Sequence, residues 1–187
     1  MKALVKHSPK VGIWMEDVPI PECGGNEVKI KITHTGNFRI DLHIYQWDEW
    51  AQRTLELPLV IGHEFCGIIE EIGPGVTHCK VGDRVSGEGI SPADSVEIVA
   101  LGKDIYAIKQ LGWVSKDLGI FRILVIPESN YGPFIILLFE IAAFFDHLEC
   151  SPHSVSYNIV GEDVLITGAG PIGIMCASIC KFVVQEM

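Results

Sequence analysis

The chain has 187 residues, is 48% hydrophobic and carries a formal net charge of −10. This acidic balance argues against a surface for nucleic acid or for an anionic membrane. The length allows one full core, or one domain and part of a second.

Targeting and redox features favour the cytoplasm. The first 14 residues, MKALVKHSPKVGIW, lack the apolar core of a signal peptide. The longest apolar run, residues 134–145, is interrupted by Glu140 and is too short to span a bilayer. The six cysteines form no Cys-x-x-Cys pair, which favours thiols in a reducing compartment over disulfides.

The first region, residues 1–90, is rich in strand signals. Residues 27–32 alternate between apolar and polar side chains, and residues 81–85 are typical of a turn that enters a short strand. Many short strands separated by glycine turns predict a compact domain of the β-barrel type. Residues 91 to about 158 keep no single period, and no element is predicted there.

The last region has a clear order of elements. Val164–Thr167 is predicted to be a buried strand, Gly168–Gly173 a glycine turn, and Ile174–Val184 a helix. In such a turn Gly168 permits the tight bend, Gly170 lets the backbone approach a pyrophosphate, and Gly173 allows close packing of helix on strand. The pattern predicts a dinucleotide site at a helix N-terminus; the alternative is a tight strand–helix turn without a ligand.

A second motif lies in the first region. Gly62, His63 and Glu64 open the pattern G-H-E-x-x-G-x-x-x-x-x-G-x-x-V, which ends at Val76. Adjacent imidazole and carboxylate groups are half of a typical zinc ligand set. The alternative is a buried histidine that happens to precede a surface glutamate.

Together these motifs resemble the zinc-dependent medium-chain alcohol dehydrogenases, and within them the bacterial L-threonine 3-dehydrogenases. The resemblance includes HIYQWDEW (43–50), VGDRVSGEG (81–89), LVIP (124–127) and VGEDVLITGAGPIGIM (160–175). It implies oxidation of the small-molecule substrate L-threonine to 2-amino-3-oxobutanoate, with zinc and NAD as cofactors. It also implies a cytoplasmic homo-oligomer, a tetramer in that family.

The resemblance also implies an α/β fold in two parts. Residues 1–155 would form a GroES-like catalytic domain of the β-barrel type that binds zinc. Residues 156–187 would begin a Rossmann NAD-binding domain, with its first strand, glycine turn and helix. The cofactor-binding residues implied are Gly168, Gly170, Ile172 and Gly173.

For the zinc site, the family pattern uses a cysteine, the His and Glu of the G-H-E motif, and a later carboxylate. These fall on position 38, His63, Glu64 and Asp146 of this chain. Position 38 is Phe38, and a phenyl ring cannot bind zinc. We nevertheless expect His63, Glu64 and Asp146 to converge, with Phe38 where the thiolate would be.

Two further features of the family pattern are altered. The proton relay pairs a threonine with a histidine; His43 is present, but the threonine position holds Ile40. Four cysteines with the spacing C-x2-C-x2-C-x7-C, which hold a structural zinc, are missing after Gly89.

The departures fall in blocks, at residues 36–40 and in much of 90–157, whereas the recognisable motifs are intact. Such a pattern predicts small insertions and deletions in the coding sequence. Cysteine codons can lie one base before the codons of Ala93, Val96, Val99 and Ala107, at the family spacing. A similar shift after Val183 would account for the last residues and predicts a truncated product.

Three functional interpretations therefore stay open. The first is an L-threonine dehydrogenase, inactive in the form that this sequence encodes and without measurable NAD binding. The second is a non-catalytic fragment or pseudogene product of another zinc alcohol or polyol dehydrogenase. The third is a small binding module without catalysis.

Overall fold

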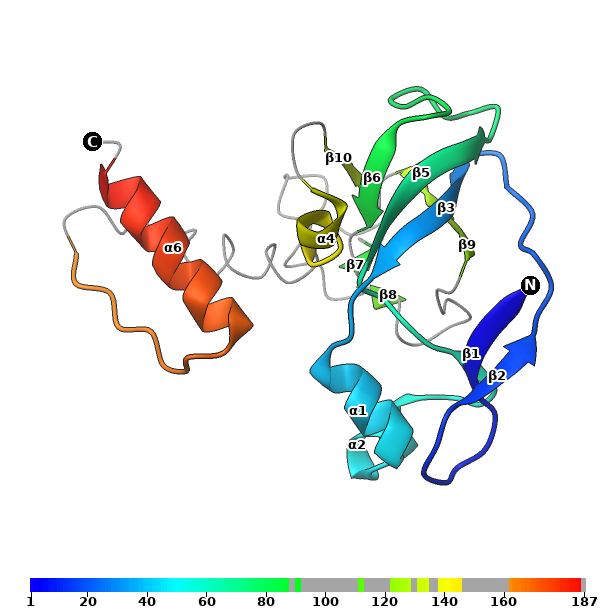
Figure 1. The fold of residues 1–187 in the computed structure, drawn as a ribbon, viewed down its shortest axis with the longest axis horizontal. Helices are drawn as coiled ribbons and strands as arrows, with labels where there is room; N and C mark the ends of the chain where they lie inside the picture. Colours follow the sequence, from blue (N-terminus) through cyan, green and yellow to red (C-terminus); the bar gives the residue numbers. More distant parts are fainter. Residues whose placement is uncertain are drawn as a thin grey trace.

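The computed structural model describes residues 1–87, 90–91, 111–112, 122–128, 131–134, 138–145 and 162–185. Strands and short helices gather on one side of the molecule, and a long C-terminal helix lies to the other side (Figure 1). No helix in these ranges is long and apolar enough to cross a membrane.

Two antiparallel sheets form the strand-rich part. The smaller has the order β2-β1-β4, which are Trp14–Asp17, Lys2–Lys6 and Leu59–Val60. The larger has the order β10-β6-β5-β3-β9, which are Tyr131–Pro133, Arg84–Gly87, Phe65–Ile72, Glu27–Thr35 and Ile123–Pro127. A short pair joins β7 (Ile90–Ser91) to β8 (Leu111–Gly112). Within the described residues these sheets are open and do not close into one barrel.

The core of the larger sheet follows from the alternation in β3. Val28 and Ile30 are completely buried, while Lys31 on the opposite face is exposed. The two buried side chains pack with Phe65 and Val85 from the neighbouring strands. The strand predicted at 27–32 is therefore confirmed and extends to Thr35. The predicted turn and strand at 81–85 are also confirmed, as a turn before β6.

Two short helices that the sequence patterns did not predict connect β3 to β4. They are α1 (Arg39–Gln46) and α2 (Glu49–Thr54). Ile44, Trp47 and Ala51 bury their side chains in a second core beneath these helices. This core fixes the start of α1 relative to the loop that precedes β5.

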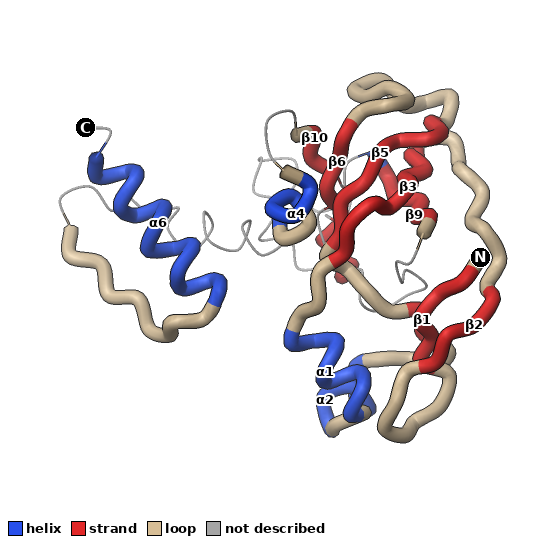
Figure 2. Tube along the Cα trace, viewed as in Figure 1, coloured by secondary structure: helices blue, strands red, loops and turns tan. Residues whose placement is uncertain are grey.

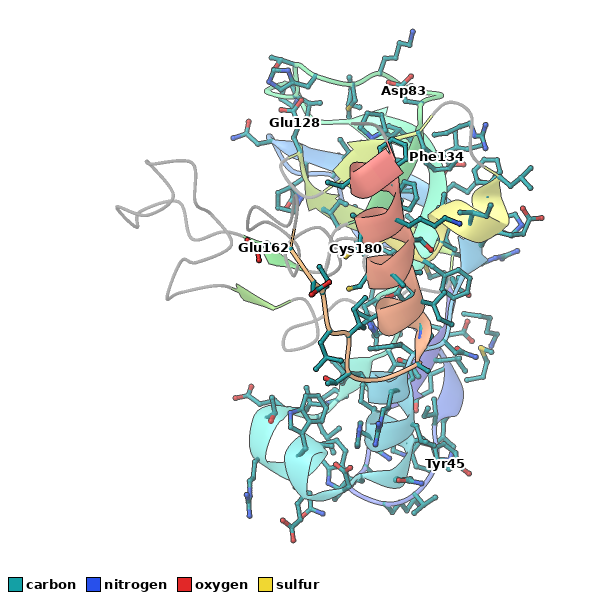
Figure 3. The ribbon with its side chains drawn as sticks, turned by 90° about the vertical axis from the view of Figure 1, so that its left-hand side faces the viewer. Tyr45, Asp83, Glu128, Phe134, Glu162 and Cys180 are labelled. Atoms are coloured by element: carbon teal, nitrogen blue, oxygen red, sulfur yellow. The ribbon has the colours of Figure 1, made fainter. Side chains whose placement is uncertain are left out.

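A buried lysine ties the smaller sheet to α1. Lys6 is completely buried, and its ammonium group donates hydrogen bonds to the backbone oxygens of Lys10, Gly12 and Tyr45 at 2.5, 2.9 and 3.0 Å. Tyr45 lies beside the loop between β1 and β2 (Figure 3). All three ammonium protons therefore have acceptors, as a buried charge requires.

The C-terminal part differs from its prediction in one respect. Val164–Thr167 is not a buried strand: it is unpaired within the described residues, and Leu165 is 88% exposed. A strand needs a hydrogen-bonded neighbour, and local sequence does not guarantee one. The helix is confirmed as α6 (Pro171–Gln185), and it follows an extended loop (Figure 2).

Within the apolar run 134–145, the structure describes Phe134 and residues 138–145. The run contains α4 (Phe139–Ala142), a single helical turn. Phe134 and Ala142 are buried against Cys66 of β5. This run therefore contributes to the core of the strand-rich part.

Candidate functional site

The His63–Glu64 pair lies in the loop between β4 and β5. Only 8% of His63 and 1% of Glu64 is exposed. Nε2 of His63 is 3.9 Å from Oε1 of Glu64, and the backbone oxygen of Glu64 accepts a hydrogen bond from the Gly36 N–H at 2.9 Å. The alternative of a surface glutamate is therefore wrong: both side chains turn inward together.

Phe38, at the position where the family pattern has a cysteine, lies beside His63. Its ring approaches the His63 ring edge-on, with a centroid distance of 6.0 Å. The expected proximity of Phe38 to His63 is therefore seen in the structure, and the metal site itself stays a prediction. The phenyl ring thus puts an apolar group beside the imidazole, where the family pattern has a metal ligand.

Asp41 is a site residue that the sequence patterns did not identify. Its Oδ2 accepts a hydrogen bond from the Phe38 N–H at 2.8 Å, which caps the first turn of α1. Its buried Oδ1 lies 4.0 Å from Nδ1 of His63. A carboxylate on the second ring nitrogen is the usual way to orient a metal-binding histidine. The sequence signal that could have identified Asp41 is its position three residues after Phe38, the N-cap of α1.

The described residues supply two adjacent metal ligands and no third. No group of three His, Cys, Asp or Glu side chains that could hold an ion occurs in the part of the chain that the structure describes. Asp146, the predicted later ligand, lies outside the described residues. A catalytic zinc needs three protein ligands, so His63 and Glu64 alone do not fit one.

Cys66 does not replace the missing thiolate, although it lies two residues after Glu64. Its Sγ donates a hydrogen bond to the backbone oxygen of Phe139 at 3.0 Å, and the side chain is completely buried. Burial raises the pKa of the Cys66 thiol, which keeps it protonated. A protonated thiol is a poor metal ligand.

His43 lies on α1 and interacts with α2. Its Nδ1 shares a hydrogen bond with Oδ2 of Asp48, and its ring lies 5.8 Å from the Trp50 ring. About a third of the His43 side chain is exposed. His43 follows Asp41 by two positions, so the two side chains leave the helix on different faces. Ile40, at the position of the relay threonine, packs into the core beneath the helices.

The glycine turn has the backbone features expected of a phosphate site. Gly168 has a φ of +106°, a conformation that favours glycine. A Cβ on Gly173 would lie 2.1 Å from the backbone oxygen of Gly168, so the close approach of turn and helix requires a glycine there. Pro171 begins α6, so the N-terminal end of the helix lies directly after the glycine turn.

The turn and the start of α1 line one pocket. The pocket has a volume of about 730 Å³. Asn37, Phe38 and Arg39 line one side; the other is lined by residues that include Gly168, Gly170, Ile172 and Gly173. All four predicted cofactor-binding residues therefore line a pocket that also contains Phe38. The sequence patterns did not identify Arg39 as its cationic lining residue.

Comparison with known proteins agrees with these features. Residues 24–135 match the family described as the alcohol dehydrogenase GroES-like domain. The chain is 47% identical over 188 residues to a protein named L-threonine 3-dehydrogenase from Marinomonas sp. (strain MWYL1), covering 98% of this chain and 54% of that protein.

Solved structures share the fold. A short chain alcohol dehydrogenase (rspB) from E. coli CFT073, complexed with NADH, has a TM-score of 0.85 at 25% identity, covering 99% of this chain and 54% of that chain. The alcohol dehydrogenase TADH from Thermus sp. ATN1 has a TM-score of 0.81 at 22% identity, covering 97% and 55%.

The chain therefore belongs to the alcohol dehydrogenase family that is built on a GroES-like domain. The predicted family and fold class are confirmed. Within that family, the relative compared here carries the name L-threonine 3-dehydrogenase. The chain spans about half the length of the curated relatives it matches.

Proposed function

We propose that this chain represents the GroES-like catalytic part of an NAD-dependent L-threonine 3-dehydrogenase. The reaction would oxidise the secondary alcohol of L-threonine to the ketone of 2-amino-3-oxobutanoate. One observation carries the proposal: the glycine turn lines the same pocket as Phe38, whose ring faces the buried His63. The 47% identity to a relative of that name supports threonine among the possible secondary alcohols.

The pocket residues fit a dinucleotide. The α6 N-terminus would bring the positive end of the helix dipole to the pyrophosphate, and Gly168 and Gly170 would let the backbone approach it. Arg39 would add a positive charge on the opposite side of the pocket, and Ile172 an apolar contact. NAD, when bound, would supply the acceptor for the hydride that leaves the substrate carbon.

His43 is our candidate for the group that takes the hydroxyl proton. It follows Arg39 by four residues on α1, so its side chain lies one turn from the pocket on the same helix face. An imidazole is suited to this step because its ordinary pKa is near neutrality.

We propose Asp146 as the third ligand beside His63 and Glu64 in a metal-binding form of the protein. The described ligands do not fit a catalytic zinc, and we therefore assign no step of the reaction to a metal. Because Phe38 removes the thiolate, we expect weak zinc binding by the chain as translated. By the same family argument we propose a cytoplasmic homotetramer.

A second candidate function is a non-catalytic fragment or pseudogene product of another zinc alcohol or polyol dehydrogenase. Phe38 favours it, and so does the exposure of Leu165, which leaves the wall of the nucleotide pocket without cover within the described residues. We accordingly expect no measurable NAD binding and no turnover by this chain.

Two measurements test these alternatives. Calorimetry with NAD on the chain as translated should show no binding; micromolar affinity would contradict the inactive form. A protein whose reading frame is restored around Phe38, after Gly89, between Asn130 and Ser156 and after Val183 should form NADH with L-threonine. It should lose activity to a chelator and be inactive with a polyol such as sorbitol. Turnover of the polyol but not of threonine would favour the second candidate.

A further inference from the structure

Asp48 faces two groups at once, one with each carboxylate oxygen. Oδ1 accepts a hydrogen bond from the Ala51 N–H at 3.1 Å and so caps α2. Oδ2 shares a hydrogen bond with Nδ1 of His43, five residues earlier in the chain. One carboxylate therefore joins the N-terminus of α2 to the side chain that we propose as the proton acceptor.

The backbone between the two residues is shaped for this contact. Trp47 ends α1 with φ 54° and ψ 50°, and it is the one non-glycine residue with positive φ in the described ranges. A left-handed conformation costs a non-glycine residue on the order of 1 kcal/mol. It reverses the chain so that Asp48 folds back onto His43. Gln52 holds the reversed segment by donating to the Trp47 backbone oxygen at 2.8 Å.

We propose that Asp48 is a positioning residue that fixes His43 as the Nδ1–H tautomer, so that Nε2 carries the lone pair that accepts the substrate proton. The role in catalysis rests on the proposed function; the tautomer itself does not. A carboxylate can only accept, so a neutral ring bonded to it must carry its proton on Nδ1. The Trp50 ring, 5.8 Å away, flanks the imidazole and limits its rotation.

The same geometry predicts the effect of an amide at this position. In Asp48→Asn the Ala51 N–H still needs an acceptor, so the amide oxygen stays there and the NH2 group turns to His43. An NH2 group donates, so Nδ1 must accept and the ring proton moves to Nε2. A single Asp→Asn change would thus invert the tautomer while the helix cap stays intact, the kind of change that disables a serine protease triad.

Long-range proton–nitrogen NMR on the 15N-labelled chain tests this directly. At roughly pH 9, above the ordinary histidine pKa, His43 should show the Nδ1–H tautomer. Its signals are assigned by their loss in His43→Gln. Asp48→Asn should shift His43 to Nε2–H. Glu49→Gln, a matched control on the neighbouring exposed carboxylate, should leave the tautomer unchanged.

Asp48→Ser separates capping from positioning. Serine is a good helix cap, so the far-UV circular dichroism should be retained while the Nδ1–H preference is lost. An Nε2–H ring in the unmodified chain would overturn the proposal, as would an unchanged tautomer in Asp48→Asn. If Asp48→Asn does not fold, the test uses the tautomer of His43 in the unmodified chain and in Asp48→Ser. An Nδ1–H tautomer that is equally populated in both would overturn the proposal.

The outcome is independent of the proposed function. A chain with the Nδ1–H tautomer whose frame-restored form does not oxidise threonine would refute the dehydrogenase assignment alone. An active frame-restored protein whose His43 carries its proton on Nε2 would refute the positioning role alone.

Discussion

Replacing Lys6 by methionine tests the tie between the smaller sheet and α1. Methionine keeps much of the side-chain volume but removes three hydrogen bonds to the backbone oxygens of Lys10, Gly12 and Tyr45. It also removes the ammonium group that lies 5.8 Å and 5.3 Å from the centroids of Trp14 and Trp47.

The expected loss follows from these contacts. The loss of three partly buried hydrogen bonds costs about 1 kcal/mol each, and the loss of two cation–π contacts about 0.5 kcal/mol each. Relief of the buried charge offsets about 1 kcal/mol of this sum. We expect the free energy of unfolding to fall by about 3 kcal/mol, a large part of a typical 5–15 kcal/mol.

Urea unfolding, followed by tryptophan fluorescence and by far-UV circular dichroism, measures this loss. The second probe is needed because Lys6 lies beside two of the indoles and its removal changes their fluorescence. Lys2→Met is the matched control, because Lys2 lies on the same strand but its ion pair with Asp17 is exposed. The urea midpoint of the Lys2→Met variant should equal that of the unmodified chain. Equal midpoints for the two variants would refute the reasoning.

Four other predictions concern the site and its origin. Phe38→Cys adds a thiolate beside His63 and should tighten zinc binding by about 3 kcal/mol, or on the order of 100-fold. Competition with a chelator measures this affinity, and an unchanged value would contradict the site assignment. In that background, Asp41→Asn should lower zinc affinity by roughly 10- to 100-fold, because the carboxylate facing Nδ1 of His63 is lost; an affinity equal to that of Phe38→Cys would argue against an orienting role. Hydrogen bonds from His43 and the Ala51 N–H lower the pKa of Asp48, so its stabilising contribution is present above the ordinary value of 3.8 and is lost as the pH falls through the lower folded pKa. The acid unfolding of Asp48→Ala should lack the stabilisation that ionised Asp48 contributes. Identical acid unfolding profiles for this variant and the unmodified chain would contradict that contribution. Accurate resequencing should find cysteine codons one base before Ala93, Val96, Val99 and Ala107; their absence would leave the altered blocks without this explanation.

Features that depend on local sequence were predictable here. The alternation in β3 predicted its buried face, and the glycine spacing after Thr167 predicted a tight turn before a helix, which the structure shows beside a pocket. In both cases the responsible residues lie within one element or one turn. The conformations they require, a pleated strand and a left-handed glycine, are set by neighbouring residues.

Features that depend on distant partners were not predictable. The strand at Val164–Thr167 was expected to be buried because its side chains are apolar, but burial needs a neighbouring strand, and none of the described residues pairs with it. The Lys6 cluster draws its acceptors from the β1–β2 loop and from the end of α1. Asp41 meets His63 only because the second core positions α1 against the loop before β5.

The buried pair itself argues for a binding site over a structural core. Placing Glu64 at 1% exposure beside His63 removes a carboxylate and an imidazole from water, which costs several kcal/mol unless other groups compensate. Apolar side chains of similar size would fill the same space at lower cost, as the phenyl ring of Phe38 does next to them. Asp41 adds a third polar group that faces the same histidine. Polar groups that converge on one histidine in this way are typical of sites built to hold a ligand. Phe38 and Ile40 are the described positions at which this chain departs from the family site, and restoring a thiolate at Phe38 is the direct way to recover a third metal ligand.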